Sequence, residues 1–287
     1  MQPCAISVLA CLLAAIGGAA GPSGLGAKLA PGAATVVLWS HSGVGVETAG
    51  HFLIFDYIRS TARSGGRVVE FVDPAELPGK TPVVFVSHAH RDHHDAAIYD
   101  WAKTLPTLHY VVSADVAGTS SFRRAALPPA RVSVLGPGER RVILDGGVEV
   151  RTVESTDAGV AFRVLVDGLR IVHSGDHALW NWKPERAAAM RDAYLGGLRR
   201  LVADGGGVDI AFLCADLRLP GLSGAAEGAA LLDPGMIVAI HNYARQAEAG
   251  AALRGALSPE LRARVAEVTG PGTLLSFPER VTAVAPR

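Results

Sequence analysis

Between residues 87 and 95 the sequence gathers side chains of the kinds that bind metal ions. The segment reads Ser-His-Ala-His-Arg-Asp-His-His-Asp and directly follows the apolar run 83–86. Side chains alternate in an extended chain, so His88 and His90 point to the same side. Two imidazoles on one side can bind a single ion. This spacing predicts a metal site at the end of a buried strand.

A turn after His90 would carry Asp92 and His93 to a second ion beside the first. Imidazole and carboxylate together suit Zn²⁺, Mn²⁺ or Fe²⁺. The chain has three cysteines, two of them within the first eleven residues, which excludes a site built from several thiolates. We therefore expect two divalent ions, zinc first, with manganese or iron as alternatives. The competing interpretation is a solvated polar loop that binds nothing.

Short apolar runs separated by turns predict a strand-rich chain. The expected strands outside residues 131–173 are 35–41, 44–48, 51–57, 67–72, 82–87, 108–113, 208–214, 236–241 and 272–278. Residues 131–166 predict a series of strands, and Asp167-Gly168 predicts a hairpin that joins 160–166 to 169–173.

Helical periodicity appears in both halves of the chain. Helices are expected at 95–105, 184–204 and 225–232 and from residue 244 onward. Hairpins mixed with helices in this way predict two sheets sandwiched between helices. The fold class is α/β (α+β), a four-layer αββα sandwich, in one domain that spans residues 35–287.

The cluster matches the signature His-x-His-x-Asp-His, so the sequence resembles the metallo-β-lactamase superfamily over about residues 35–276. The stretch Trp-Ser-His-Ser-Gly at 39–43 and the segment Phe-Asp-Tyr at 55–57 look like that family's first hairpins. Within it, the segments 155–159, 175–176 and 180–182 are similar to a group near the ascorbate-phosphate lactonase-like branch. The resemblance implies the metallo-β-lactamase fold and a metal-dependent hydrolase.

The resemblance also implies ligands far from the cluster. Asp176 would bridge both ions, and His241 would complete the shell of the second ion. Read alone, Asp176 is a common turn residue and His241 a structural histidine at a strand end. Many members supply a further histidine to the first ion before the bridging aspartate. Here Asp157 occupies that place, where it either replaces the histidine as an oxygen ligand or shapes the turn.

Other side chains near these positions have weaker assignments. Asp56 is expected to orient a ligand imidazole. His41 and His177 are candidates for proton donation or substrate contact, and His94 is expected to point away from the cluster. Trp180 and Trp182 either line the substrate pocket or pack in the core, and Asp216 with Arg218 is expected to form an ion pair.

These residues together predict a hydrolase that uses a metal-activated water on a small ester, lactone or phosphoester. Asp92 would be the catalytic residue, and Trp180 and His177 are weak substrate-binding candidates. One alternative is a mononuclear iron oxidoreductase on the same fold, favoured if the shell of the first ion differs from the zinc type. The other alternative is a non-catalytic metal-binding protein.

Composition limits the partners. The 27 basic and 27 acidic residues cancel, so nothing favours nucleic acid, and a small-molecule substrate is expected. Residues 1–34 are set apart as a leader, because no charge precedes Lys28 and the apolar run 6–16 is shorter than the roughly 20 residues of a membrane span. It fits a signal peptide that would export the protein, or an upstream extension of a cytoplasmic one. The oligomeric state is left open.

Overall fold

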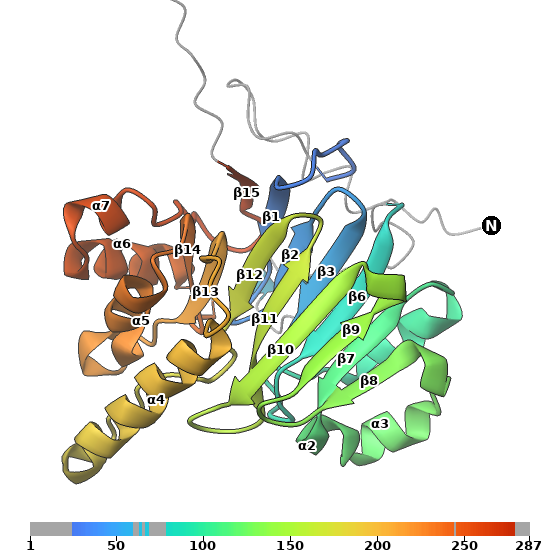
Figure 1. Cartoon of the computed structure of the whole chain (residues 1–287), viewed down its shortest axis with the longest axis horizontal. Helices are drawn as coiled ribbons and strands as arrows, with labels where there is room; N and C mark the ends of the chain where they lie inside the picture. The colour runs from blue at the N-terminus through green and yellow to red at the C-terminus, as the bar shows by residue number, and fades with distance from the viewer. Residues whose placement is uncertain (1–24, 60–62, 65–66, 69–78, 244, 279–287) are drawn as a thin grey trace, which may run out of the picture.

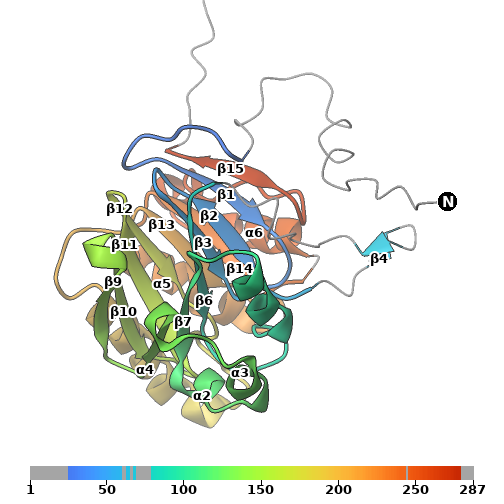
Figure 2. The ribbon, with the colours of Figure 1, turned by 90° about the vertical axis from the view of Figure 1, so that its right-hand side faces the viewer.

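The computed structural model describes residues 25–59, 63–64, 67–68, 79–243 and 245–278. In it, two β-sheets face each other, with helices on the outer side of each (Figures 1 and 2). The first sheet has the order β15-β1-β2-β3-β6-β7-β8. Its strands are Leu274–Phe277 (β15), Ala34–Leu38 (β1), Val44–Glu47 (β2), His51–Phe55 (β3), Thr81–Val86 (β6), His109–Ser113 (β7) and Val132–Leu135 (β8).

The second sheet has the order β14-β13-β12-β11-β10-β9. Its strands are Met236–Ile240 (β14), Ile210–Cys214 (β13), Leu169–His173 (β12), Val160–Val166 (β11), Val148–Glu154 (β10) and Arg140–Ile143 (β9). The hairpin predicted at residues 167–168 joins β11 to β12 in an antiparallel pair. A separate pair of short strands, Arg63–Ser64 (β4) and Arg67–Val68 (β5), lies outside both sheets.

Side chains alternate along a buried strand, so a single strand contributes to two hydrophobic cores. In β6, Val83 and Phe85 pack between the two sheets, whereas Val84 and Val86 face the outer helix layer. Burial of both faces is what the unbroken apolar run in this strand predicts. The strand that leads into the histidine cluster is therefore packed on one face by the core between the sheets and on the other by the core beneath the outer helices.

Helices form the two outer layers (Figures 1 and 2). The first sheet is covered by the 3₁₀ helix Ala96–Lys103 (η3) with Ala114–Ala117 (α2) and Ser120–Ala125 (α3). The second is covered by Ala187–Leu201 (α4), Ala225–Leu232 (α5), Gln246–Ala256 (α6) and Pro259–Arg262 (α7). The predicted four-layer αββα sandwich is confirmed.

Strand direction gathers the loops that matter at one edge. In the first sheet β1, β3 and β6 run the same way, and in the second β10, β12 and β14 do. The loops after these six strands contain the predicted ligands and Asp56. Carboxyl ends of parallel strands meet at a common edge, so residues far apart in sequence converge there.

The structure also differs from the sequence predictions. The helix expected at 95–105 is the 3₁₀ helix η3, because α and 3₁₀ helices both bring residues i and i+3 close and periodicity does not separate them. The helix expected from residue 184 begins with a 3₁₀ turn, Pro184–Arg186, before α4. Helices α2 and α3 were not predicted.

Two predictions fall wholly or partly outside the described residues. These are most of the leader, at 1–24, and part of the strand expected at 67–72. Within the described ranges, no helix combines the length and apolar character needed to cross a bilayer.

Candidate metal centre

The histidine cluster forms a tight turn at the end of β6. The backbone N–H groups of His93 and His94 both donate to the carbonyl of His90, at 3.1 and 2.9 Å. The turn buries His88 and His93 completely and leaves His90 half exposed. This turn directs Asp92 and His93 to a different place from His88 and His90, as the sequence predicts.

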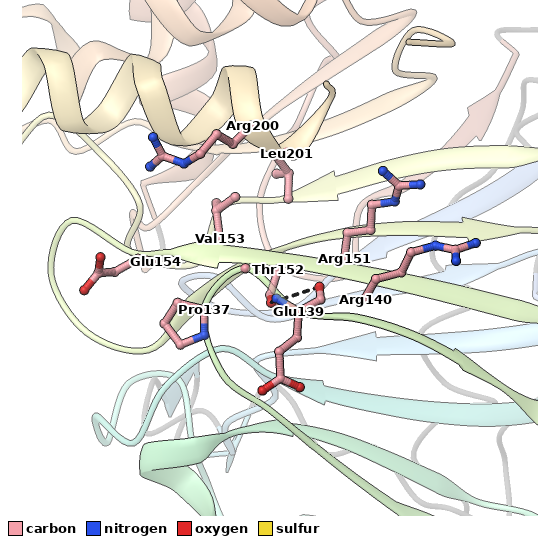
Figure 3. Close-up of a pocket in the computed structure, with 10 residues that line it drawn as sticks. Pro137, Glu139, Arg140, Arg151, Thr152, Val153, Glu154, Arg200 and Leu201 are labelled. Carbon is pink, nitrogen blue, oxygen red and sulfur yellow. Dashed lines mark hydrogen bonds between the residues drawn. The ribbon is translucent and has the colours of Figure 1, made fainter. Parts of the chain in front are cut away.

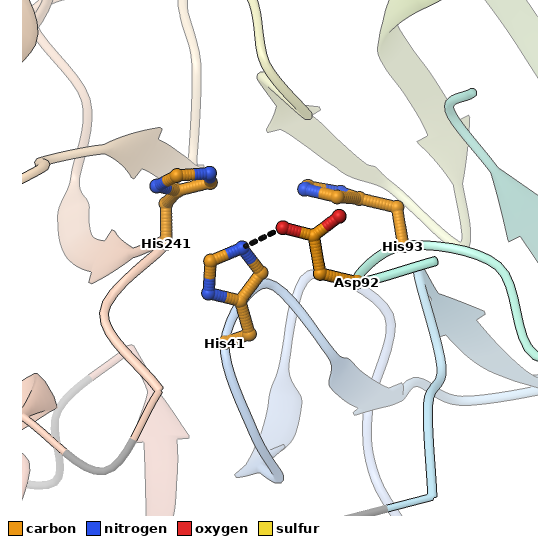
Figure 4. Close-up of side chains that lie close together, drawn as sticks. All are labelled: His41, Asp92, His93 and His241. Carbon is orange, nitrogen blue, oxygen red and sulfur yellow. Dashed lines mark ion pairs between the residues drawn. The ribbon is translucent and has the colours of Figure 1, made fainter. Parts of the chain in front are cut away.

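Eight side chains converge into two groups of potential metal ligands. The first, here called the inner site, consists of His41, Asp92, His93 and His241 (Figure 4). The second, here called the outer site, consists of His88, His90, Asp157 and Asp176. Within each group, one donor atom from every residue lies within 4.8 Å of the others. All seven metal ligands predicted from the sequence are in these two groups.

Asp176 lies between the two groups. Its Oδ1 is 3.0 Å from His93 Nε2 and 3.4 Å from His241 Nε2, and its Oδ2 is 3.5 Å from His88 Nε2. The loop that holds it requires Gly175, which has φ +51° and whose Cβ would lie 2.7 Å from the side chain of Ser87. Asp176 thus has the position of a carboxylate shared by two ions.

A second close approach brings Asp157 to the outer site. A Cβ at Gly159 would lie 2.0 Å from the Ser87 carbonyl oxygen, so the loop after β10 packs directly on the start of the cluster. Val160 N–H donates to the same carbonyl at 3.0 Å. Asp157 Oδ2 then lies 3.5 Å from His90 Nδ1.

Asp56 orients the buried imidazoles, as the sequence predicts. Its carboxylate accepts hydrogen bonds from His93 Nδ1 at 2.7 Å and from the backbone and hydroxyl of Ser87 at 2.8 and 2.6 Å. The Ser87 hydroxyl in turn lies 3.0 Å from His88 Nδ1. Both rings therefore present Nε2 to the centre, an arrangement typical of metal-binding histidines.

Several buried donor atoms at the centre have no hydrogen-bond partner. These are His88 Nε2, His93 Nε2 and Asp176 Oδ1. A buried polar atom without a partner costs about 1–3 kcal/mol. An ion in the inner site would satisfy His93 Nε2 and an ion in the outer site would satisfy His88 Nε2, with Asp176 Oδ1 between them, so the side chains present fit two metal ions.

The charges of the donors suit metal binding as well. Burial lowers the pKa of His88 and of His241 to about 4, which keeps their imidazoles neutral. Burial acts the same way on His93, but Asp176 and Asp56 outweigh it and raise its pKa to about 10. Burial opposes the ionisation of Asp176, yet His93 holds its pKa well below the usual range. Neutral imidazoles and ionised carboxylates are the forms that coordinate, so His88, His241 and Asp176 have the required charge, whereas a metal ion would have to displace a proton from His93.

No protein-family model matches the sequence, and no curated protein matches it. Three solved structures that share its fold are the metallo hydrolase Igni18 from Ignicoccus hospitalis, YhfI from Bacillus subtilis, described as a metallo-β-lactamase fold protein, and a mutant of the β-hydroxylase CmlA. Igni18 aligns with a TM-score of 0.60 and 15% identity over 86% of this chain and 100% of its own. YhfI aligns with a TM-score of 0.52 and 12% identity over 85% of this chain and 99% of its own.

The protein has the metallo-β-lactamase fold. CmlA aligns with a TM-score of 0.50 and 15% identity over 74% of this chain and 46% of its own, so the same architecture occurs in a hydrolase and in a hydroxylase. Identities this low speak for the fold alone. The predicted fold is confirmed, and the proximity to the ascorbate-phosphate lactonase-like branch stays a prediction.

Within the metallo-β-lactamase fold, His177 does not reach the centre. Its ring is buried beneath α4, where Nε2 donates to the Tyr194 carbonyl at 2.9 Å. A Cβ at Gly197 of that helix would lie 2.4 Å from the ring. The loop after β12 turns this side chain toward the helix layer, so His177 lies outside both ligand groups, and its contact with substrate stays a prediction.

The remaining assignments differ in outcome. Trp180 lies beside the inner site, 5.4 Å from the His241 ring, and its Nε1 donates to the Asp176 carbonyl at 2.8 Å. His94 points away, 2.7 Å from the Tyr99 hydroxyl, as expected. The predicted ion pair forms between Asp216 and Arg218, at 2.5 Å. Asp216 also lies 3.3 Å from His241 Nδ1, so it helps to orient that ring.

Two side chains make closer contacts with the inner-site residues than the sequence indicated. His41, predicted only as a proton donor or substrate contact, lies among the inner-site ligands. Tyr243, which was not predicted, stacks on His41 at 4.0 Å and donates to Asp92 Oδ2 at 3.3 Å. The only sequence signal for Tyr243 is its place two residues after His241.

A cavity of about 1110 Å³ opens beside the inner site, with Asp92 and Tyr243 in its lining. Arg91, His94 and the hydroxyl-bearing residues 119–121 also line it. A smaller cavity of about 480 Å³ lies between β10 and α4, with Thr152 and Glu139 hydrogen-bonded at its floor (Figure 3). None of its lining residues belongs to the inner or outer site, so the larger cavity is the candidate substrate pocket.

Proposed function

We propose that this protein is a metal-dependent hydrolase of small ester, lactone or phosphoester substrates. The observation that carries the proposal is the convergence of two ligand groups on Asp176, next to a large cavity. The fold match to the metallo hydrolase Igni18 supports it. Two bound divalent ions would lower the pKa of water and polarise the scissile group.

The protein's own residues would position the reacting groups. Asp176 would keep the two sites at a fixed separation. The contact with His41, whose Nε2 lies 3.2 Å from Asp92 Oδ2, is the main cause that holds the pKa of Asp92 well below its usual range, with His93 adding to it. An anion of such low basicity orients a proton rather than keeping it, so we assign Asp92 to positioning the nucleophile.

Aromatic side chains next to the centre would hold the substrate. Tyr243 and Trp182 are both more than half exposed, and Trp182 stacks on Trp180 with ring centroids 6.4 Å apart. Trp180 contacts His241 of the inner site. Large, rigid faces with polar ends are typical of small-molecule sites. They favour a substrate with an apolar or planar group near the cleaved bond.

The test is a panel of generic lactones, carboxylic esters and phosphodiesters with zinc- and manganese-loaded protein. We expect turnover that disappears on chelation and returns with added metal. His109→Gln is the matched control, because this histidine contacts Ser133 and belongs neither to the two sites nor to the lining of the candidate pocket. Turnover that survives complete metal removal would contradict the proposal, and metal binding without turnover of any ester would favour a non-catalytic metal-binding protein.

The composition of the outer site favours a second candidate, an iron oxidoreductase. The site's two imidazoles and two carboxylates, from His88, His90, Asp157 and Asp176, form a mixed nitrogen and oxygen set that suits iron as well as zinc. The same fold occurs in the β-hydroxylase CmlA. Protein loaded anaerobically with Fe²⁺ would consume oxygen if this candidate is right. Ester turnover with zinc and no oxygen uptake with iron would eliminate it.

A further inference from the structure

His41 reaches the metal centre from the first hairpin of the fold, far from the other ligands in the sequence. It lies in the turn between β1 and β2, closed by the hydrogen bond from Gly43 N–H to the Ser40 carbonyl at 2.7 Å. His241 N–H donates to the His41 carbonyl at 2.9 Å, which ties this turn to the end of β14. The position of the His41 ring is therefore set by both sheets.

The ring of His41 is buried and lacks hydrogen bonds of its own. Its side chain is 1% exposed, and neither Nδ1 nor Nε2 has a hydrogen-bond partner of good geometry. The ring packs against His241 and Tyr243, each at 4.0 Å, and its Nε2 lies 3.2 Å from Asp92 Oδ2 (Figure 4). A buried imidazole that makes no such bond and faces two other candidate ligands has the surroundings of a metal ligand.

The two sites differ in enclosure. In the inner site the imidazoles of His41, His93 and His241 are at most 5% exposed. In the outer site His90 and Asp157 are 54% and 46% exposed. Counting Asp176, which faces both groups, the inner ion would have five protein ligands and the outer ion four. Because an open position is what lets a zinc ion accept a further ligand, fewer protein ligands and greater exposure make the outer ion the more exchangeable of the two.

We propose that His41 is a metal ligand that closes the inner site, so that the inner ion is retained tightly while the outer ion is exchangeable. The proposal rests on the metal centre of the proposed function and adds a division of labour between its two ions. It assigns to the β1–β2 hairpin a direct part in metal binding.

The test measures metal binding rather than activity. Wild-type protein and His41→Asn are loaded with Co²⁺, titrated with a competing chelator and analysed for metal per chain. Asparagine tolerates the left-handed backbone at this position, φ +57°, and can still donate to Asp92. It removes only the imidazole donor. His109→Gln, outside both sites and the candidate pocket, is the control, and circular dichroism checks that each variant folds.

We expect wild type and His109→Gln to hold two ions, one of which resists the chelator. His41→Asn should weaken that resistant ion by more than about 100-fold, beyond the roughly 10- to 100-fold loss typical when only an outer partner of a ligand is removed. Its cobalt spectrum should also change in the intensity of the visible bands that report coordination number.

Two results would overturn the proposal. Unchanged cobalt affinity and spectrum in folded His41→Asn would show that His41 is only a hydrogen-bond partner of Asp92, while the hydrolase proposal would stand. Two exchangeable ions of equal affinity in the wild type would remove the division of labour. If His41→Asn fails to fold, loading His41→Gly, which adopts the left-handed backbone without strain, with Co²⁺ gives the same comparison of metal per chain. Two ions with no ester turnover would instead leave this inference intact and defeat the hydrolase.

Discussion

The inner and outer sites use the same kinds of side chain in different surroundings. The inner site draws three imidazoles and one carboxylate from three loops and keeps its imidazoles buried. The outer site has two imidazoles and two carboxylates, with one of each half exposed. Burial of the inner site excludes water and strengthens the binding of its ion, whereas exposure of the outer site leaves room beside its ion. One centre can thus combine a retained ion with an accessible one.

The strongest disruption of both sites should come from Asp176, because it lies between them. Asp176→Asn removes the shared negative charge, and we expect hydrolysis to fall by at least about 10³-fold, the scale of losing a principal electrostatic group. Elemental analysis should show loss of metal from both sites. A variant that keeps two ions and most of its turnover would separate the sites and contradict the bridging role.

Substitution of Asp157 should affect the outer site alone. Asp157→Ala is expected to lower metal content from two ions to one and to reduce turnover by roughly 100-fold, because the accessible ion loses a ligand while the inner one keeps its shell. Asp157→His is the sharper variant, since it converts the outer set to three imidazoles. Full metal content in Asp157→Ala, measured by elemental analysis, would make this carboxylate a turn residue.

The shared support of the two sites can be weakened without touching a ligand. Asp56→Asn should reduce metal affinity by about 10- to 100-fold. An amide cannot accept from both the Ser87 hydroxyl and His93 while also accepting the Ser87 N–H. We expect unfolding of the metal-free protein to become easier by about 1–3 kcal/mol. Isothermal titration with zinc and urea unfolding would measure the two effects, and equal values in wild type and variant would refute the role.

The smallest effect on activity is expected at His177, next to Asp176 in sequence and outside both sites. His177→Gln should keep turnover within about twofold of wild type, since no reacting group touches this ring. A tenfold loss of kcat in a well-folded variant with unchanged metal content would show that His177 acts in the substrate site.

The same variant makes a prediction about stability and pH. Burial lowers the pKa of His177 to about 4, below the value of 6.5 in an unfolded chain. The unfolded state then binds more protons between pH 6.5 and 4, so this group stabilises the fold above that window and the stabilisation is lost as the pH falls through it. The loss amounts to at most about 3 kcal/mol. Urea unfolding across this window would measure the difference in unfolding free energy between wild type and His177→Gln, and this difference should fall as the pH falls. A difference that does not change with pH would contradict the prediction.

Much of the centre was predictable because its signals are local. The spacing of His88, His90, Asp92 and His93 after an apolar run identifies ligands through the two-residue repeat of a strand and one turn. The position of His241 at a strand end and of Asp176 after another supplied the distant ligands once the family resemblance was known. The strand-by-strand pattern was also sufficient to predict the four layers.

The sequence by itself determined which elements form and which short motif can bind metal, since both depend on neighbours within a few residues. The tertiary structure decided that His41 belongs with the inner site and that His177 does not. Both are histidines near a strand end, and only the order and direction of strands in two sheets separate them. That order is a property of long-range pairing, and local spacing does not encode it.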